Sequence, residues 1–235
     1  MIKTNKVSLH IGDKTILNNA SCEVAKQRIT AFIGHSGAGK TSLLKCIANL
    51  NAGYSGTITY EGMPIINLSA EQRVHAIGFV FQQFNLFPHM TVLQNCMHPM
   101  TAVLGFDMST AQAKALATLK SLGIEMLKDA YPAKLSGGQQ QTVAIARVLC
   151  LDPKVLLFDE PTSALDPKST KTLQLLLKEL VKVGVTIALS SHDMAFVQGV
   201  MDKVYFMSDG QIIEVYDVTT GSEIPPQINA FLKNQ

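Results

Sequence analysis

The chain has 235 residues, of which 47% are hydrophobic and only 16% are charged, and its formal net charge at pH 7 is +2. This length allows one domain with a sizeable core, or a core with one appended subdomain. An average soluble domain is about 25% charged, so either partner proteins cover part of the surface or the composition has simply drifted. No block of Lys or Arg stands out, so the charge pattern gives no indication of nucleic acid as a partner.

No apolar run reaches the roughly 18 residues of a membrane span. Residues 1–6 lead into no apolar signal core, so we expect the protein to stay in the cytoplasm. The cysteines are far apart and form no Cys-x-x-Cys pair, so we interpret them as small buried hydrophobes. They are Cys22, Cys46, Cys96 and Cys150.

Hydrophobic periodicity predicts strands and helices in alternation along most of the chain. Short runs rich in β-branched and aromatic residues predict buried strands, and apolar residues at helical spacing predict helices. In chain order these are a strand at 29–33, a helix at 40–48, strands at 57–60 and 77–81, helical structure over 90–123, a helix at 140–149, a strand at 155–158, a helix at 170–183, a strand at 185–189 and a hairpin of 204–207 with 211–214. Ser109 or Thr110 is expected to cap a helix within 90–123.

This order predicts an α/β protein with a largely parallel core sheet. Before residue 30 and around residues 55–81 the chain is rich in strands without intervening helices. That pattern predicts an antiparallel sheet laid against the core.

A phosphate-binding loop follows the first core strand, because residues Gly34–Thr41 fit the pattern G-x-x-x-x-G-K-[ST]. Glycines let the backbone curl so that several N–H groups point at one centre. The helix that starts there adds its positive dipole end. Lys40 then supplies a cation for the β- and γ-phosphates, and the Thr41 hydroxyl is a ligand suited to Mg²⁺.

Two acidic residues, Asp159 and Glu160, end the strand at 155–158. The carboxyl end of a core strand lies beside a phosphate-binding loop in a wound parallel sheet. We therefore expect Asp159 to hold Mg²⁺, directly or through water. Glu160 is expected to orient or deprotonate the attacking water.

A second anion-binding helix start is predicted at Leu135–Gln139, where a serine and two glycines precede the helix at 140–149. One chain thus has two helix starts suited to bind phosphate, and only the first of them follows a phosphate-binding loop. A head-to-tail pair with two-fold symmetry would let each end close over the partner's ATP. The alternative interpretation of this segment is an ordinary capped helix.

The motifs and their order resemble those of the ABC transporter ATPases over about residues 2–232. The matching segments are Gly34–Thr41, Gln82, Leu135–Gln139, Val155–Glu160, Ser163–Asp166 and His192. The resemblance implies that Gln82 contacts the metal and the attacking water and senses the membrane subunit. It also implies that Asp166 lies at the dimer seam and that His192 reaches the γ-phosphate; without it, His192 would be an ordinary surface or capping histidine.

The fold implied by the resemblance is a P-loop NTPase core with a parallel sheet, an antiparallel β subdomain and an inserted α-helical subdomain. Residues 1–235 would form one ABC ATPase domain, with 1–86 and 150–235 as the core and β subdomain and 87–149 as the helical subdomain. ATP and Mg²⁺ are the implied cofactors. The implied nucleotide contacts are Ile11, Gly34, His35, Ser36, Gly37, Ala38, Gly39, Lys40, Thr41, Ser42, Ser136, Gly137, Gly138, Gln139 and Asp166. The implied catalytic residues are Glu160, His192 and Gln82, and the implied metal ligands are Thr41, Gln82 and Asp159.

Three longer stretches resemble the importers of polar amino acids: residues 79–92, 131–141 and 230–232. Importers of phosphonate or methionine and some lipid-handling relatives are similar there, so those solutes remain alternatives. Phe84, Leu86 and Phe87 lie in a predicted loop and either form a groove for a helix of the membrane subunit or pack into the core.

Four positions depart from the family pattern. Ile11 stands where an aromatic residue usually stacks on adenine, which removes about 0.5–1.5 kcal/mol of aromatic attraction. Thr142 replaces the usual arginine, and Asp193 replaces the usual glutamate. The stretch 215–218 lacks the usual glycine. These changes indicate a divergent member of the family.

The expected function is the ATP-hydrolysing subunit of an importer for a polar amino acid, bound peripherally to the cytoplasmic face of the membrane. Its expected partners are a second copy of itself, membrane-embedded permease subunits and, indirectly, a solute-binding protein. The alternative is a non-transport relative such as an Fe–S assembly ATPase, which the length allows and the 82–92 stretch argues against.

Overall fold

The structure is a computed structural model that describes residues 1–233, and its elements alternate between strands and helices. The strands are β1 (Ile2–Ile11), β2 (Lys14–Val24), β3 (Ile29–Ile33), β4 (Ser55–Tyr60), β5 (Met63–Pro64), β6 (Ile77–Val80), β7 (Val155–Asp159), β8 (Thr186–Ser190), β9 (Lys203–Ser208) and β10 (Gln211–Asp217). The helices are α1 (Lys40–Ile47), α2 (Ala70–Ala76), α3 (Val92–Leu104), α4 (Met108–Ser121), α5 (Gly137–Leu149), α6 (Pro167–Lys182), α7 (Met194–Val200) and α8 (Pro226–Lys233). Short 3-10 turns lie at Ile65–Asn67, Glu125–Leu127, Pro132–Lys134 and Val218–Thr220.

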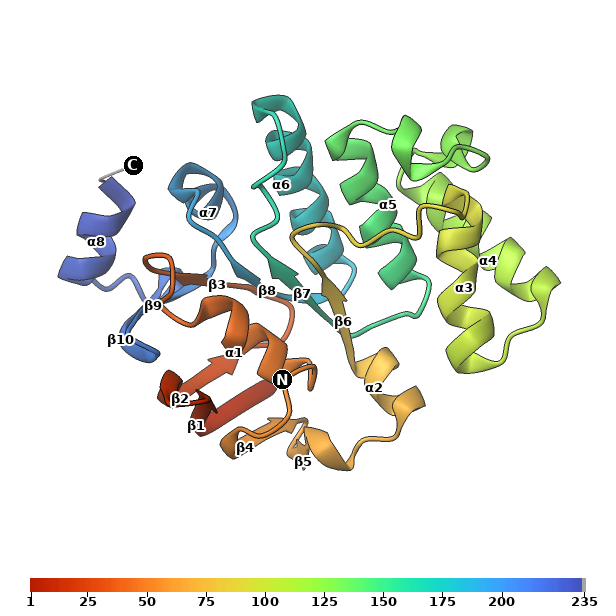
Figure 1. Ribbon diagram of the computed structural model, residues 1–235. Helices are drawn as coiled ribbons and strands as arrows, with labels where there is room; N and C mark the ends of the chain where they lie inside the picture. The colour runs from red at the N-terminus through yellow and green to blue at the C-terminus, as the bar shows by residue number, and fades with distance from the viewer. Residues whose placement is uncertain (234–235) are drawn as a thin grey trace.

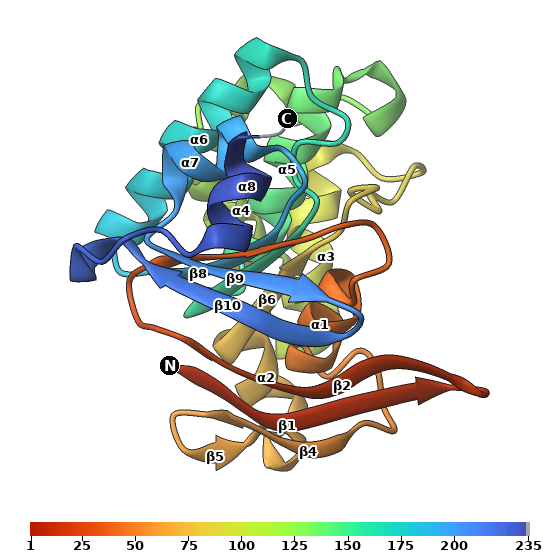
Figure 2. The same cartoon turned by 90° about the vertical axis from the view of Figure 1, so that its left-hand side faces the viewer.

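Two sheets form the frame of the molecule. The larger has the strand order β10-β9-β3-β8-β7-β6, in which β9, β3, β8, β7 and β6 are parallel and β10 is antiparallel to β9. The smaller is antiparallel, in the order β2-β1-β4-β5. Figure 2 shows the smaller sheet below the larger one, with helices α5 to α8 stacked on the opposite side of the larger sheet. The predicted α/β core with an antiparallel β subdomain is confirmed.

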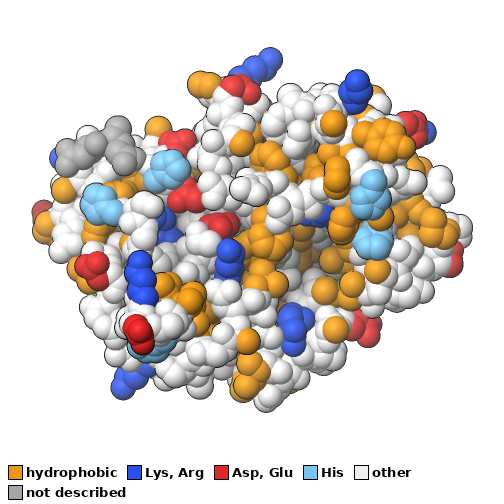
Figure 3. Space-filling model, viewed as in Figure 1, with side chains coloured by type: hydrophobic (Ala, Val, Ile, Leu, Met, Phe, Trp, Pro, Cys, Tyr) orange, Lys and Arg blue, Asp and Glu red, His pale blue; other side chains and the backbone are white. Residues whose placement is uncertain are grey.

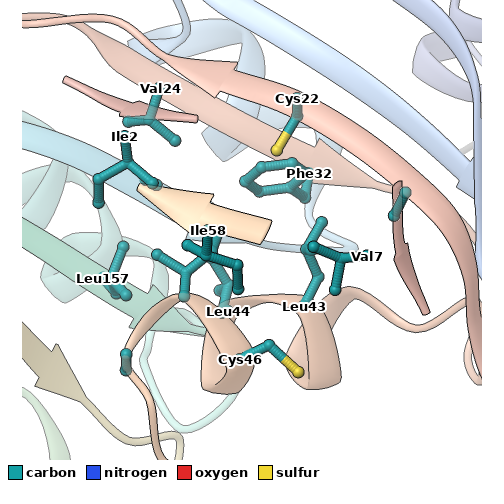
Figure 4. Close-up of a cluster of buried hydrophobic side chains, with 14 of the residues drawn as sticks. Ile2, Val7, Cys22, Val24, Phe32, Leu43, Leu44, Cys46, Ile58 and Leu157 are labelled. Carbon is teal, nitrogen blue, oxygen red and sulfur yellow. The ribbon is translucent and has the colours of Figure 1, made fainter. Parts of the chain in front are cut away.

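Helix α1 is buried between the two sheets. Its apolar side chains Leu43, Leu44 and Cys46 are fully buried and face both sheets. Figure 4 shows them meeting Val7 and Ile58 of the small sheet, with side chains of the large sheet close by. Because burial of each such side chain stabilises the fold by roughly 1.5–3 kcal/mol, the start of α1 is held firmly in place.

Helices α3, α4 and α5 form a separate helical half with its own apolar cluster, seen on the right of Figure 1. The C-terminal helices α6, α7 and α8 instead pack on the large sheet. All four cysteines are buried, as the sequence predicts. None of the helices within residues 1–233 is both long enough and apolar enough to span a membrane.

Three element predictions need correction. The 77–81 run belongs to the parallel sheet as β6, paired with β7, and not to the antiparallel one. Helix α5 begins at Gly137, three residues before the predicted start, because Ser136 caps it through a reciprocal pair of bonds with Gln139. Helix α4 is capped by Asp107, whose carboxylate accepts two backbone N–H groups, and not by Ser109 or Thr110.

The close packing of α5 on β6 gives a test of the fold. A Cβ on Gly78 would collide with a methyl group of Val148 and lie 3.0 Å from Leu156 Cδ2. We expect Gly78→Ala to lower the free energy of unfolding in urea by about 1–3 kcal/mol, the usual cost of overpacking. Gly199→Ala is the control, because its Cβ meets only the movable amide of Gln174. Equal losses in the two variants would contradict this packing.

Candidate functional site

The phosphate-binding loop joins β3 to α1 at the carboxyl edge of the large sheet. Gly34 has a φ of +143°, and a Cβ there would collide with the backbone carbonyl of Met207, so only glycine fits. The Lys40 side chain is buried and curls back over the loop, donating to the Gly34 carbonyl at 2.7 Å and the His35 carbonyl at 3.1 Å. The loop thus holds its own cation at its centre.

Lys40 also faces two carboxylates. Its Nζ lies 4.0 Å from Glu160 Oε1. Burial lowers the pKa of Lys40 from its ordinary value, and the nearby charges of Glu160 and Asp159 oppose that shift. The two carboxylates thus counteract the effect of burial on the Lys40 cation.

Asp159 ends β7 and is bound to the loop across the sheet. Its Oδ1 accepts from the Thr41 hydroxyl at 2.6 Å and from the Ser190 hydroxyl at 2.8 Å. The side chain is almost fully buried. A buried carboxylate beside a threonine hydroxyl offers the hard oxygen ligands that Mg²⁺ prefers.

Glu160 follows directly and has a left-handed backbone with a φ of +47°, which is uncommon for a residue with a side chain. Its N–H donates to Ser190 O at 3.1 Å, which anchors this bend to β8. The carboxylate accepts from the His192 backbone N–H at 3.2 Å and lies 2.7 Å from His192 Nδ1. The sharp bend thus directs Glu160 toward Lys40 and His192.

These groups surround a cavity of about 790 Å³. It is lined by Lys14, Thr15, Ile16, His35, Ser36, Gly37, Ala38, Gly39, Lys40, Thr41, Ser42, Gln82, Glu160, His192, Ser208, Asp209 and Gly210. Most of the predicted core of the site is therefore brought together, with Asp159 joined to it through Thr41.

Six lining residues were missed by sequence reasoning, from β2 and from the β9–β10 turn. The sequence predicts the turn but not its position: Gly210 N donates to Ala38 O at 3.2 Å, which joins the turn to the phosphate-binding loop. Gly210 has a φ of +75°, and a Cβ there would lie 2.6 Å from Ile16 O. A glycine in a hairpin turn indicates that another backbone segment can pack closely against the turn. It does not indicate which segment that is.

Ile11 lies at the end of β1, is 61% exposed and does not line the cavity. Neither do Ser136, Gly138, Gln139 and Asp166, which line a second cleft between α5 and α6 that shares no residue with the first. The two predicted anion-binding helix starts of one chain therefore open into different cavities.

The segment from Leu135 to Gln139, here called the signature segment, rests on the start of α6. A Cβ on Gly137 would lie 2.7 Å from Ala164 O, and one on Gly138 would lie 2.6 Å from Ser169 Oγ. Asp166 caps α6 by accepting from the backbone N–H of Lys168 and Ser169 and from the Ser169 hydroxyl. Those bonds lower the pKa of Asp166 below its ordinary value.

Two of the departures from the family pattern have local structural roles. The Thr142 hydroxyl donates back to Gly138 O at 2.9 Å within its own helix. Asp193 caps α7 by accepting from Phe196 N at 2.9 Å. In the loop after β6, Phe84 is buried in the core, while Leu86 and Phe87 are partly buried. Core packing thus accounts for Phe84.

Fold and site together define a P-loop nucleotide-binding domain. The sequence profile of the ABC transporter family matches residues 17–163. The chain belongs to the ABC transporter family, and it is an ATP-binding and ATP-hydrolysing cassette of that family.

Curated relatives cover nearly the whole chain. The arginine transport ATP-binding protein ArtM of Bacillus subtilis is 43% identical over 91% of this chain and 90% of its own length. The glutamine transport ATP-binding protein GlnQ of the same organism is 42% identical over 91% of this chain and 89% of its own length. The glutamate/aspartate import ATP-binding protein GltL of Escherichia coli K12 is 39% identical over 91% of this chain and 90% of its own length.

Solved structures share the fold. A bacterial ABC transporter cassette solved as a dimer is 31% identical, with a TM-score of 0.83 over 93% of this chain and 99% of its own. A dimeric cassette in a post-hydrolysis state with ADP and Pi is 30% identical, with a TM-score of 0.82 over 93% of this chain and 99% of its own. The predicted P-loop NTPase fold is confirmed, and the likeness to dimeric cassettes supports dimerisation within a transporter complex.

The contact of Gly138 with Ser169 gives a test of how the signature segment is seated. Alanine in place of a helical glycine would normally stabilise by up to about 1 kcal/mol. We expect Gly138→Ala instead to lower the free energy of unfolding in urea, because its Cβ meets Ser169 Oγ. In a Ser169→Ala background the loss should shrink by at least about 0.5 kcal/mol, a measurable coupling. Additive effects in this double-mutant cycle would contradict the contact.

Proposed function

We propose that the cavity around the phosphate-binding loop holds ATP, with Lys40 and the loop backbone on the β- and γ-phosphates. Support comes from the way Lys40 is held: its two bonds go to loop carbonyls, which phosphate oxygens can replace as stronger, charge-assisted partners. Ser36, Gly37 and Ser42 line the same cavity. Their backbone N–H groups and hydroxyls are the expected remaining phosphate contacts, along with those of His35, Ala38, Gly39 and Thr41.

Thr41, Asp159 and Gln82 are the proposed holders of Mg²⁺. The fit rests on their donor atoms: a hydroxyl and a carboxylate already 2.6 Å apart, with an amide on the cavity wall. When bound, the ion would neutralise charge developing on the phosphates. The protein's own part is to hold the Asp159 carboxylate in position, which the hydrogen bond from the Ser190 hydroxyl supports.

Glu160 is the proposed general base. Its carboxylate borders the cavity and has a proton-accepting oxygen on the side of Lys40. His192 is proposed to hold that carboxylate through the other oxygen, 2.7 Å from its ring nitrogen, and to reach the γ-phosphate once ATP is bound. A proton taken from water by Glu160 would leave the oxygen free to attack phosphorus.

The site is proposed to be completed by a second copy of the chain. The observation that carries this is that Ser136, Gly138 and Asp166 open into a cleft separate from the loop's own cavity. A two-fold pair places each signature segment over the partner's ATP, so that its helix start adds donors to the exposed phosphates. In this arrangement residues 1–235 act as one ATPase domain with 87–149 as its helical part, and Asp166 lies near the seam.

The proposed solute is a polar amino acid, carried inward through membrane-embedded permease subunits and delivered by a solute-binding protein. Support comes from the relatives, which are named for arginine, glutamine and glutamate or aspartate transport. Apolar side chains that gather on the helical half in Figure 3 favour a protein partner there; Val103, Met108 and Met126 of that half are exposed. The chain would then sit peripherally on the cytoplasmic face of the membrane.

Removing the base should trap the closed pair. We expect Glu160→Gln to hydrolyse ATP at least about a hundredfold more slowly, the usual weight of general-base catalysis, and to accumulate as a dimer with ATP and Mg²⁺. Size-exclusion chromatography with light scattering measures the dimer, and phosphate release measures turnover. With ADP the same variant should be monomeric.

Two further variants control this experiment. Ser136→Arg in the Glu160→Gln background should abolish the dimer while leaving the loop intact, and Lys40→Ala should abolish hydrolysis in a folded chain. A Glu160→Gln protein that turns over at the wild-type rate would contradict its role as base. One that binds ATP and stays monomeric would contradict the composite site.

Disruption of the gene should reduce uptake of a polar amino acid, most strongly a basic one or glutamine. Complementation with the wild-type gene should restore uptake, and complementation with Lys40→Ala should not, because transport needs the hydrolysed ATP. The measurement is uptake of labelled amino acids by whole cells. Normal uptake of every amino acid, beside a defect for an unrelated solute, would contradict the proposed class.

A further inference from the structure

The C-terminal helix α8 contacts the phosphate-binding loop through a pair of rings. The ring centroids of His35 and Phe231 lie 5.2 Å apart, and the ring planes meet at 85°, an edge-to-face arrangement. His35 is the second residue of the loop, whereas Phe231 lies near the end of α8. Figure 1 shows α8 on the left, beside the loop that follows β3. The pair therefore joins the loop to a helix at the other end of the sequence.

The ring of Phe231 is also packed against the large sheet. Phe231 is only 9% exposed, and its ring meets the ring of Phe206 with the centroids 5.4 Å apart and the planes at 66°. Phe206 of β9 is the register partner of Ile33, the residue directly before the loop. Phe231 thus lies between the sheet at the start of the loop and the side chain of His35.

Helix α8 is anchored by contacts that do not involve the loop. The carboxylate of Glu214 in β10 accepts from the backbone N–H groups of Gln227 and Ile228, both at 3.0 Å. The side-chain amide of Gln198 in α7 donates to Leu232 O at 3.3 Å. Ile228 is fully buried. Because α8 is fixed in this way, it gives Phe231 a defined position from which its ring can restrain His35.

His35 in turn carries one of the carbonyls that hold Lys40. Its side chain is exposed and lines the cavity around the loop, so burial does little to fix it. Its backbone carbonyl accepts from Ala38 N at 3.1 Å and from Lys40 Nζ at 3.1 Å. A change in the backbone at His35 would therefore displace an acceptor of the Lys40 cation.

We propose that Phe231 is a positioning residue of the nucleotide site, which holds His35, and with it the first turn of the loop, in the conformation that binds phosphate. This inference rests on the proposed ATP site. Phe231 does not line the cavity and acts on the free protein by keeping the empty loop ordered. When only a fraction of the free protein is competent to bind, the observed Kd rises by the inverse of that fraction.

Replacing the ring tests this role. Phe231→Leu keeps an apolar side chain and removes the aromatic pair, which is worth about a two- to tenfold change in an equilibrium constant. We expect the Kd of the purified full-length chain for ATP, measured by calorimetry with Mg²⁺ chelated, to rise by about that factor. In steady-state hydrolysis KM should rise and kcat should stay unchanged, because the loop has its wild-type arrangement once ATP is bound.

A purely structural role gives a different result. If Phe231 only filled the core, Phe231→Leu would lower the free energy of unfolding, and the molecules that remain folded would bind ATP as wild type does. Phe196→Leu is the control: Phe196 is buried in the same apolar cluster and pairs with no other aromatic ring among residues 1–233. It should lower the free energy of unfolding and leave the Kd for ATP unchanged.

A double-mutant cycle with the exposed His35 shows whether the effect passes through that residue. In a His35→Ala background, Phe231→Leu should no longer change the Kd for ATP, because the ring has no partner left to hold. An equal rise in Kd with and without His35 overturns the proposal. So does an unchanged Kd in the single variant Phe231→Leu, or an equal rise in Phe196→Leu.

Lys40→Ala, measured in the same way, separates this inference from the function on which it rests. If Lys40→Ala binds ATP as tightly as wild type, the proposed ATP site is wrong, and the role of Phe231 fails with it. If Lys40→Ala loses ATP binding while Phe231→Leu keeps the wild-type Kd, the ATP site stands and only the positioning role of Phe231 is overturned.

Discussion

The register of three parallel strands is the constraint on which the site depends. Phe32 of β3 pairs with Ser190 of β8, and Ser190 pairs with Asp159 of β7. This places the end of β3, where the phosphate-binding loop begins, level with the acidic end of β7. The hydroxyl of Ser190 then bridges to Asp159, which bonds Thr41 on the far side of the loop. A shift of one residue in either pairing would turn Asp159 to the other face of the sheet.

The second constraint is that the signature segment lies in a different part of the chain from the phosphate-binding loop and lines a different cavity. It begins α5 and contacts the start of α6 through Gly137 and Gly138, so its position depends on these two helices and not on α1. The loop instead follows α1, which is fixed between the two sheets. The two helix starts of one chain open into different cavities, so in the proposed dimer each ATP would be held by two chains at once, and its hydrolysis would release them.

The sequence was most informative where residues make short-range signals. Gly34–Thr41 has a pattern whose chemistry depends on local backbone geometry, and the strands at 29–33 and 155–158 are short buried runs that only a covered parallel sheet accommodates. The cavity therefore contains Lys40, Glu160 and His192 as expected.

Long-range contacts were beyond that reasoning. Periodicity could not show that 77–81 joins β7 across some 75 residues of intervening chain, because a four-residue strand looks the same in either sheet. Nor could it show that the β9–β10 turn lies against Ala38, or that Ile11 is not among the residues that line the cavity.

In the proposed dimer, the signature segment of one chain lies over the phosphate-binding loop of the other. Ser36 and Ser136 are both exposed, and the four native cysteines are buried, so introduced thiols can be oxidised selectively. We would mix a chain carrying Ser36→Cys with one carrying Ser136→Cys, add ATP with a chelator of Mg²⁺ to prevent hydrolysis, and oxidise. We expect a disulfide-linked dimer of the two variants with ATP and little cross-linking with ADP. No cross-link with ATP, or equal cross-linking with ADP, would contradict it.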